Sequence, residues 1–154
     1  MALQIDEPAP DFKAAATGEQ TLSLADYAGQ RLVLYFYPRD NTPGCTQEGE
    51  GFRDLYDAFV AENTAIVGVS RDSLRKHENF RAKHDFPFHL ISDSDERLCE
   101  AYDVLKEKNM YGRTHVGIER STFLIDDKSV VRNIWRGVKV ADHAQEVLEA
   151  VRAL

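Results

Sequence analysis

Cysteine is scarce in this sequence, and long apolar runs are missing. The 154 residues include two cysteines, Cys45 and Cys99. Two are too few for the disulfide framework of a small secreted protein or for a cysteine-based zinc site. The longest apolar run, Leu32–Tyr37, is far shorter than the ~20 residues that span a bilayer. These absences exclude a membrane-spanning protein, and each cysteine is best considered as a single thiol.

Positive charge is also in short supply. The chain has 26 acidic and 19 basic residues, a net charge of -7, and no long run of Lys or Arg. Nucleic acids and anionic membranes bind through such basic patches, so we expect neither as a partner. Residues 1–10 lack the basic start and apolar stretch of a secretory signal, which predicts a cytoplasmic location.

What is present is typical of one globular domain. Hydrophobic residues make up 43% of the chain and charged residues 29%, close to the average for soluble proteins. The length suits one domain of ordinary size, and no repeat, low-complexity stretch or linker divides the sequence. We therefore expect a single domain over residues 1–154.

Strand and helix patterns alternate along most of the chain. Arg31–Tyr37 and Thr64–Ser70 are β-branched, aromatic and almost continuously apolar, as in strands buried on both faces. Further strands are predicted at Phe88–Ile91, Ser121–Asp126 and Val130–Trp135, the last two joined as a hairpin.

Apolar residues at helical spacing predict the helices. One begins near Cys45 and extends through Phe59. The others follow the cap Asp72-Ser73 to about Lys83, run through Leu98 and Tyr102, and follow the cap Asp142. This order predicts an α/β protein with a mixed central sheet flanked by helices, parallel strands at its centre and the hairpin at its edge, as in thioredoxin-like folds.

Two segments carry no strong periodic pattern. The first thirty residues are expected to be rich in loops, with a turn at residues 17–19 and one helical turn within Ser23–Tyr27. Lys106–Gly117 is predicted to be a long polar loop.

Cys45 follows a buried strand and a turn and stands at the start of a helix. Ligands bind beyond the carboxyl ends of strands in such sheets, and a helix N-terminus favours a thiolate, which is the nucleophilic form. Pro43 suits the first helical turn, and Gly44 allows close approach of the backbone to whatever Cys45 attacks. Cys99 lies instead within an amphipathic pattern beside Leu98, where packing explains it.

The segment Pro38-Arg-Asp-Asn-Thr42-Pro43-Gly44-Cys45-Thr46 resembles the active-site loop of peroxiredoxins, specifically of the bacterioferritin comigratory protein, or Q-type, branch. The resemblance continues over nearly the whole chain. The further segments are Phe52-Arg-Asp54, Val67-Gly-Val-Ser70, Met110-Tyr-Gly112 and Glu119-Arg120-Ser-Thr-Phe-Leu-Ile-Asp126. It implies a thioredoxin-like fold and a thiol-dependent peroxidase that reduces hydrogen peroxide and organic hydroperoxides, with Cys45 becoming a sulfenic acid.

The same resemblance implies roles for the residues around Cys45. Thr42 would bring its hydroxyl to the peroxide, although capping the helix is an equal alternative on sequence alone. Arg120 would face Cys45 and stabilise negative charge, where an exposed strand-end cation is the ordinary alternative. Glu48 would hold Arg120, or simply be an acid in a first helical turn. Pro38 would shield the thiolate, and backbone N–H groups of Gly44 and Cys45 would complete the pocket.

The chain departs from the family pattern in one respect. Many Q-type members carry a second cysteine five residues after the first, which would fall on Glu50, or on the next helix near Asn79-Phe80-Arg81; both positions lack sulfur here. We favour reduction of the sulfenic acid by an external donor, which is thioredoxin, glutaredoxin or a small thiol. Cys99 as an atypical resolving cysteine, and a disulfide between Cys45 of two molecules, remain alternatives.

Other classes of protein fit less well. A thioredoxin-type disulfide reductase needs Cys-x-x-Cys, and Cys45 is followed by Thr-Gln-Glu. Five histidines could in principle bind a metal, but no two stand at i, i+4 on one helix face, so we interpret them as surface residues and expect no metal or cofactor. They are His77, His84, His89, His115 and His143.

A redox sensor that oxidises once and does not turn over remains a non-enzymatic alternative. The protein is expected to be a monomer.

Overall fold

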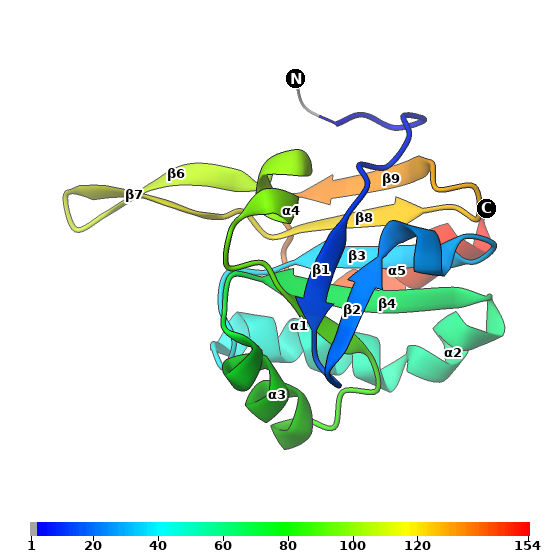
Figure 1. Cartoon of the computed structure of the whole chain (residues 1–154), viewed down its shortest axis with the longest axis horizontal. Coiled ribbons are helices and arrows are strands. Elements are labelled where there is room, and N and C mark those ends of the chain that lie inside the picture. The colour runs from blue at the N-terminus through cyan, green and yellow to red at the C-terminus, as the bar shows by residue number, and fades with distance from the viewer. Residues whose placement is uncertain (1–2) are drawn as a thin grey trace.

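The protein is described by a computed structural model that covers residues 3–154. Its centre is a mixed sheet of seven strands in the order β2-β1-β5-β4-β3-β8-β9, with helices packed against it (Figure 1). The predicted mixed sheet flanked by helices is therefore confirmed. No helix in the described part of the chain is long and apolar enough to cross a membrane.

The sheet is built around three parallel strands. β3 (Arg31–Phe36) pairs with β4 (Thr64–Ser70) along its whole length, and β4 pairs with β5 (His89–Ser92). Side chains of β3 from Leu32 onward are buried, as their continuous apolarity predicts for a strand covered on both faces. β8 (Ser121–Ile125) lies antiparallel to β3, and β9 (Val131–Arg136) forms the antiparallel edge expected of the hairpin.

The first thirty residues contain more regular structure than predicted. β1 (Lys13–Ala16) and β2 (Gln20–Ser23) form a hairpin around the predicted turn, and η1 (Leu24–Tyr27) is the predicted helical turn. The sequence of β1, Lys-Ala-Ala-Ala, has little strand propensity. The strand is stabilised by its pairing with β2 and by the pairing of Ala16 with Ile91 of β5.

The helices follow the predicted order with one interruption. α1 (Pro43–Asp54) and α2 (Tyr56–Ala61) replace the single predicted helix, because the backbone leaves helical geometry at Leu55. The remaining helices are α3 (Leu74–Lys83), α4 (Arg97–Ala101) and α5 (His143–Arg152). Ser73 caps α3 as predicted, since its side chain accepts a hydrogen bond from the Lys76 N–H.

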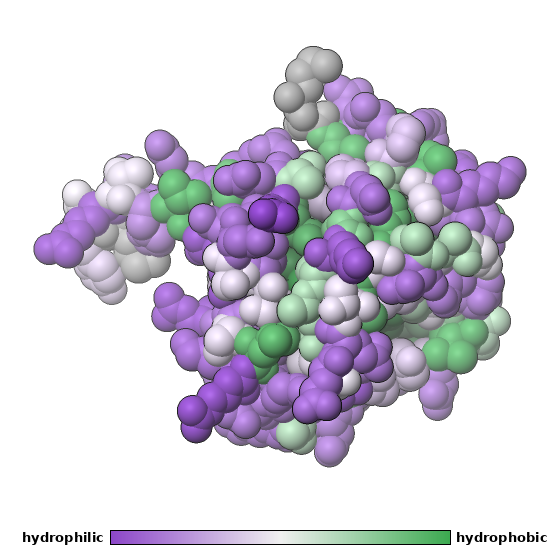
Figure 2. Space-filling view, viewed as in Figure 1, coloured by the Kyte–Doolittle hydropathy of each residue, from purple (hydrophilic) through white to green (hydrophobic). Residues whose placement is uncertain are grey.

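The prediction of a polar loop at Lys106–Gly117 is wrong. β6 (Leu105–Met110) and β7 (Arg113–Ile118) form a two-stranded antiparallel arm that extends away from the main sheet (Figure 1). Tyr111 and Gly112 make its turn, both with positive φ, 55° and 75°, as two-residue hairpins require. Hydrophilic side chains cover most of the face seen in Figure 2, including much of the arm.

The sheet separates two apolar cores. Alternate residues of β3, continued by Tyr37 directly after it, point to opposite faces: Leu32, Leu34 and Phe36 pack in one core, and Val33, Tyr35 and Tyr37 pack in the other. Cys99 belongs to the first core and Cys45 to the second. The two thiols therefore lie on opposite sides of the central sheet.

The interpretation of all five histidines as surface residues is wrong for two of them. His77 is 0% exposed and His143 is 3% exposed. Each is buried with polar partners: His77 contacts Asp40, and His143 Nε2 lies 2.8 Å from the Thr122 hydroxyl. Sequence spacing gave no sign of these partners, which come from distant segments.

Candidate active site

The strand-to-helix connection places Cys45 where the sequence predicts. β3 ends at Phe36, Pro38 is the second residue of the connecting loop, and Thr42 is the N-cap residue of α1 with Pro43 at its first helical position. Cys45 lies in the first turn of α1 and is 2% exposed. The thiol is thus held at the positive end of a helix, in a nearly water-free position.

Arg120 contacts the thiol directly. Its Nη2 lies 3.4 Å from Cys45 Sγ, within hydrogen-bonding range of sulfur. The antiparallel pairing of Phe36 with Ser121 brings the start of β8 beside the end of β3, and so brings Arg120 to the loop that carries Cys45. The alternative of an exposed strand-end cation is excluded, because the Arg120 side chain is only 16% exposed.

Glu48 fixes the guanidinium from the opposite side. Its Oε1 accepts a hydrogen bond of 2.7 Å from Arg120 Nη1, and its side chain is 1% exposed. Oε2 is buried and has no hydrogen-bond partner within residues 3–154. Burial raises the pKa of Glu48 to about 7, only partly opposed by the positive charge of Arg120. Near neutral pH, both the neutral and the charged form of Glu48 are therefore populated.

Gly44 leaves the space that Arg120 occupies. A Cβ atom added at Gly44 would lie 3.2 Å from Arg120 Nη2, closer than most real Cβ contacts. The sequence suggested that Gly44 allows close approach of the backbone to a substrate. The structure adds a second reason for glycine here, because any side chain would press on the guanidinium.

Thr42 occupies the N-cap position, but its hydroxyl is directed into the loop and accepts no hydrogen bond from the helix. It donates a 2.9 Å hydrogen bond to the Arg39 carbonyl, and α1 has no side-chain cap hydrogen bond. The capping alternative for Thr42 is therefore wrong. Pro38, two residues after the end of β3, is half-buried.

Cys99 has surroundings unlike those of Cys45. It is 0% exposed on α4, and its backbone N–H donates a 2.8 Å hydrogen bond to Asp93. Burial, with the nearby Asp93 carboxylate, raises the pKa of Cys99 well above its usual value. A thiol held in this protonated form is a poor nucleophile.

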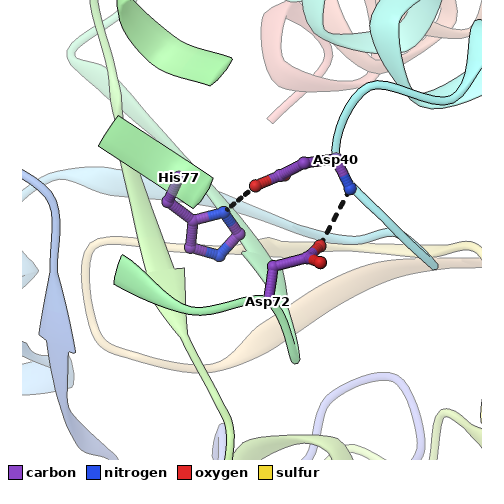
Figure 3. Close-up of side chains that lie close together, drawn as sticks. All are labelled: Asp40, Asp72 and His77. Carbon is purple, nitrogen blue, oxygen red and sulfur yellow. Dashed lines mark hydrogen bonds and ion pairs between the residues drawn. The ribbon is translucent and has the colours of Figure 1, made fainter. Parts of the chain in front are cut away.

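A buried polar cluster, which the sequence analysis did not predict, lies beneath the active-site loop. Asp40, in the middle of the loop, contacts His77 of α3, and its backbone N–H donates to Asp72 (Figure 3). Tyr37, the residue after β3, donates its hydroxyl proton to the same Asp40 carboxylate. The sequence offers two signals for this cluster, an Asp within the motif and a His on a predicted helix. Nothing in the sequence indicates that these two residues contact each other.

Comparison with known proteins decides the family. The sequence pattern of the AhpC/TSA family matches residues 5–134. Peroxiredoxin Bcp of Xanthomonas campestris is 52% identical over 143 residues, which cover 93% of this chain and 89% of that protein. The chain belongs to the Q-type peroxiredoxins. It is a thiol-dependent peroxidase, as the motif around Cys45 predicts.

Solved structures agree with this assignment. The bacterioferritin comigratory protein of Xanthomonas campestris, described in connection with its alkyl peroxide reduction activity, matches with a TM-score of 0.89 and 51% identity over 92% of this chain and 90% of that one. A mutant of the Xylella fastidiosa Q-type peroxiredoxin matches with a TM-score of 0.94 and 45% identity over 99% of this chain and 98% of that one. The predicted thioredoxin-like fold is therefore confirmed. The two cysteines of this peroxiredoxin leave both a one-cysteine and a two-cysteine mechanism open.

Proposed function

We propose that Cys45 is the peroxidatic cysteine, that it reduces hydrogen peroxide and organic hydroperoxides, and that an external thiol restores it in a one-cysteine cycle. The single observation that carries this proposal is the contact of Cys45 Sγ with Arg120, itself held by buried Glu48. A cation fixed 3.4 Å from a thiol in the first turn of a helix favours the thiolate that peroxide chemistry requires.

The proposed reaction has two stages. The Cys45 thiolate attacks one peroxide oxygen, the O–O bond breaks, and the other oxygen leaves as hydroxide or alkoxide and takes up a proton; the sulfur becomes a sulfenic acid. A reducing thiol then attacks that sulfur and releases water, which leaves a mixed disulfide. A second thiol releases Cys45 and completes the disulfide of the reductant.

Each neighbouring group has a proposed role. Arg120 stabilises the thiolate and the charge that develops on the peroxide oxygens, and Thr42 orients the peroxide through its hydroxyl. Backbone N–H groups of Gly44 and Cys45 complete the pocket. Glu48 positions Arg120, and Pro38 limits the access of water to the thiolate. Glu48 and Pro38 are positioning residues, because neither needs to touch the substrate.

The placement of Cys99 supports an external reductant. The central sheet stands between Cys99 and Cys45, and Cys99 is packed in the opposite core. A disulfide requires Cα atoms within about 7 Å, so Cys99 would reach Cys45 only after extensive local unfolding. Thioredoxin, glutaredoxin or a small thiol fits this role, and a cytoplasmic location, where such thiols are kept reduced, is part of the proposal.

Organic hydroperoxides enter the proposal through the alkyl peroxide reduction named for the Xanthomonas relative. A single domain over residues 1–154 that acts as a monomer is likewise proposed, since one chain supplies Cys45, Arg120 and Glu48. Gel filtration with light scattering in the reduced and oxidised states checks the monomer.

Intact mass spectrometry of peroxide-treated protein tests the cycle. With one equivalent of peroxide and no thiol, we expect the mass to rise by one oxygen atom, located on Cys45. Added glutathione should convert this species to a mixed disulfide and then to the original thiol. A loss of two hydrogen atoms instead, which marks an internal Cys45–Cys99 disulfide, would contradict the one-cysteine cycle. A single oxidation that no thiol reverses would indicate a sensor.

A further inference from the structure

We propose that His77 is a positioning residue for peroxide reduction: through Asp40 it holds the loop that carries Thr42 and Cys45 in its reactive geometry. This inference rests on the proposed role of Cys45. His77 lies on α3 and is 0% exposed. It comes from outside the active-site motif.

Asp40 is attached to three different parts of the fold. Its Oδ1 accepts a 2.6 Å hydrogen bond from the Tyr37 hydroxyl at the end of β3, and its Oδ2 lies 2.6 Å from His77 Nδ1. Its backbone N–H donates a 2.8 Å hydrogen bond to Asp72, between β4 and α3. Figure 3 shows Asp40 reaching from the loop toward the imidazole. The middle of the loop is thereby fixed to the sheet and to α3.

The hydrogen bonds of His77 define where its protons lie. Nε2 is 2.9 Å from the carbonyl oxygen of Ile91, and a carbonyl only accepts, so Nε2 carries a proton. One further proton then lies between His77 Nδ1 and Asp40 Oδ2. The two side chains are 0% and 2% exposed, and a buried pair of this kind is costly to break by removing one partner. His77 thus bridges the loop to β5.

The loop needs such an anchor because of its backbone. Asn41 has φ 63°, a left-handed conformation that is uncommon outside glycine, although asparagine adopts it more readily than most residues. Asp40 holds the chain just before Asn41, and the bond from Thr42 to the Arg39 carbonyl closes the turn after it. Release of Asp40 would let Asn41 relax and would displace Thr42 and α1 relative to Arg120.

A metal ion is the alternative occupant of this cluster. Ligand atoms of Asp40, Asp72 and His77 lie within 4.8 Å of one another. Each already has a protein partner: Asp72 Oδ2 accepts from the Asp40 N–H and from the Ser70 hydroxyl at 2.7 Å, and both nitrogens of His77 are engaged. These contacts favour a hydrogen-bonded anchor over a cation site.

Two substitutions of His77 separate its two bonds. The amide nitrogen of His77→Asn falls near the original Nδ1 and can still donate to Asp40, whereas that of His77→Gln falls near Nε2 and serves only the Ile91 carbonyl. We expect His77→Gln to slow the single-turnover oxidation of Cys45 by about 10-fold or more, because small displacements of reacting groups cost that much. His77→Asn should stay within about 3-fold of the wild-type rate, since its anchor is retained.

Asp40 provides a second pair in case the His77 variants fail to fold. The amide of Asp40→Asn can accept from Tyr37 and donate to neutral His77, so the rate of Cys45 oxidation should be retained. In Asp40→Ala this rate should fall as it does in His77→Gln. Hydrogen exchange of the amides at 41–46 supplies a readout independent of chemistry, and should accelerate only in Asp40→Ala and His77→Gln.

Equal oxidation rates in His77→Asn and His77→Gln, or rates that follow melting temperature alone across the four variants, would overturn the inference. So would a rise in the melting temperature of wild-type protein on addition of zinc chloride that EDTA reverses, since it would show a metal site. Failure of wild-type Cys45 to oxidise at all would refute the proposed function instead, and the exchange data would still report on the anchor.

Discussion

Cys45 and Cys99 are separated by the central sheet, each packed in a different core. Both thiols are buried and each is the third residue of a helix, but the sulfur of Cys45 lies 3.4 Å from Nη2 of Arg120. The carboxylate of Asp93 lies beside Cys99 instead. This difference in surroundings divides the two cysteines into one reactive thiol and one packed thiol.

Removal of either oriented hydrogen-bonding group should slow the chemical step. Thr42→Val and Arg120→Met are each expected to reduce the second-order rate constant of Cys45 oxidation by about 100-fold or more, the usual loss for one preorganised hydrogen-bonding group. Stopped-flow measurement at several pH values checks this. Thr42→Ser is the matched control, because it keeps the hydroxyl and should stay near the wild-type rate. If Cys45 of either variant oxidises at the wild-type rate, the residue substituted in that variant is not catalytic.

The space at Gly44 can be tested within the same helix. Gly44→Ala would place a Cβ atom 3.2 Å from the Arg120 guanidinium and should slow oxidation several-fold by moving that group. Gly51→Ala is the matched control in α1, since its Cβ would meet only the Ala144 side chain, at 3.3 Å. We expect the control to oxidise normally. Equal rates for both alanine variants would show that Arg120 adjusts without loss.

Glu48 should make stability depend on pH. Its pKa is raised from 4.5 to about 7 in the folded protein, so the folded state binds the proton more tightly than the unfolded state does. The resulting stability is fully present below pH 4.5 and is lost as pH rises through 7, a change of about 3 kcal/mol at most. Urea unfolding between pH 4.5 and 8 measures it.

The control for this dependence is Glu48→Gln, which cannot ionise. Its free energy of unfolding should change less over the same range than that of the wild type. An equally steep decline in the variant would assign the dependence to other groups.

A cysteine grafted at Glu50 should protect the enzyme from excess peroxide. Without a nearby resolving thiol, the Cys45 sulfenic acid is exposed to a second peroxide, which yields sulfinic acid that ordinary thiols do not reverse. Glu50→Cys, five residues along α1, should capture it as a disulfide after the first turn unwinds. Activity during turnover at high peroxide and low thiol should then decline more slowly than in the wild type.

Glu50→Ser is the matched control for this graft. If the wild type accumulates no sulfinic acid during prolonged peroxide exposure without thiol, the premise is wrong, and rapid internal capture by Cys99 would explain its resistance.

Sequence patterns predicted the parts of the fold that are encoded locally. β3, β4 and α3 are apolar or capped in ways that need no partner to identify, and the motif around Cys45 located the site. The β6–β7 arm was missed because its strands are mostly polar and are defined by pairing across the Tyr111-Gly112 turn. The burial of His77 was missed because its partner Asp40 lies 37 residues away in the sequence.

The central claim is that Cys45 reacts with peroxide and an external thiol restores it. Steady-state peroxide consumption by Cys45→Ser and Cys99→Ser, each supplied with thioredoxin or with glutathione and glutaredoxin, tests it most directly. We predict that Cys45→Ser has no turnover and that Cys99→Ser keeps most of the wild-type rate with at least one donor. Loss of turnover in Cys99→Ser, with single-turnover oxidation of its Cys45 intact, would contradict the account and identify Cys99 as the resolving cysteine.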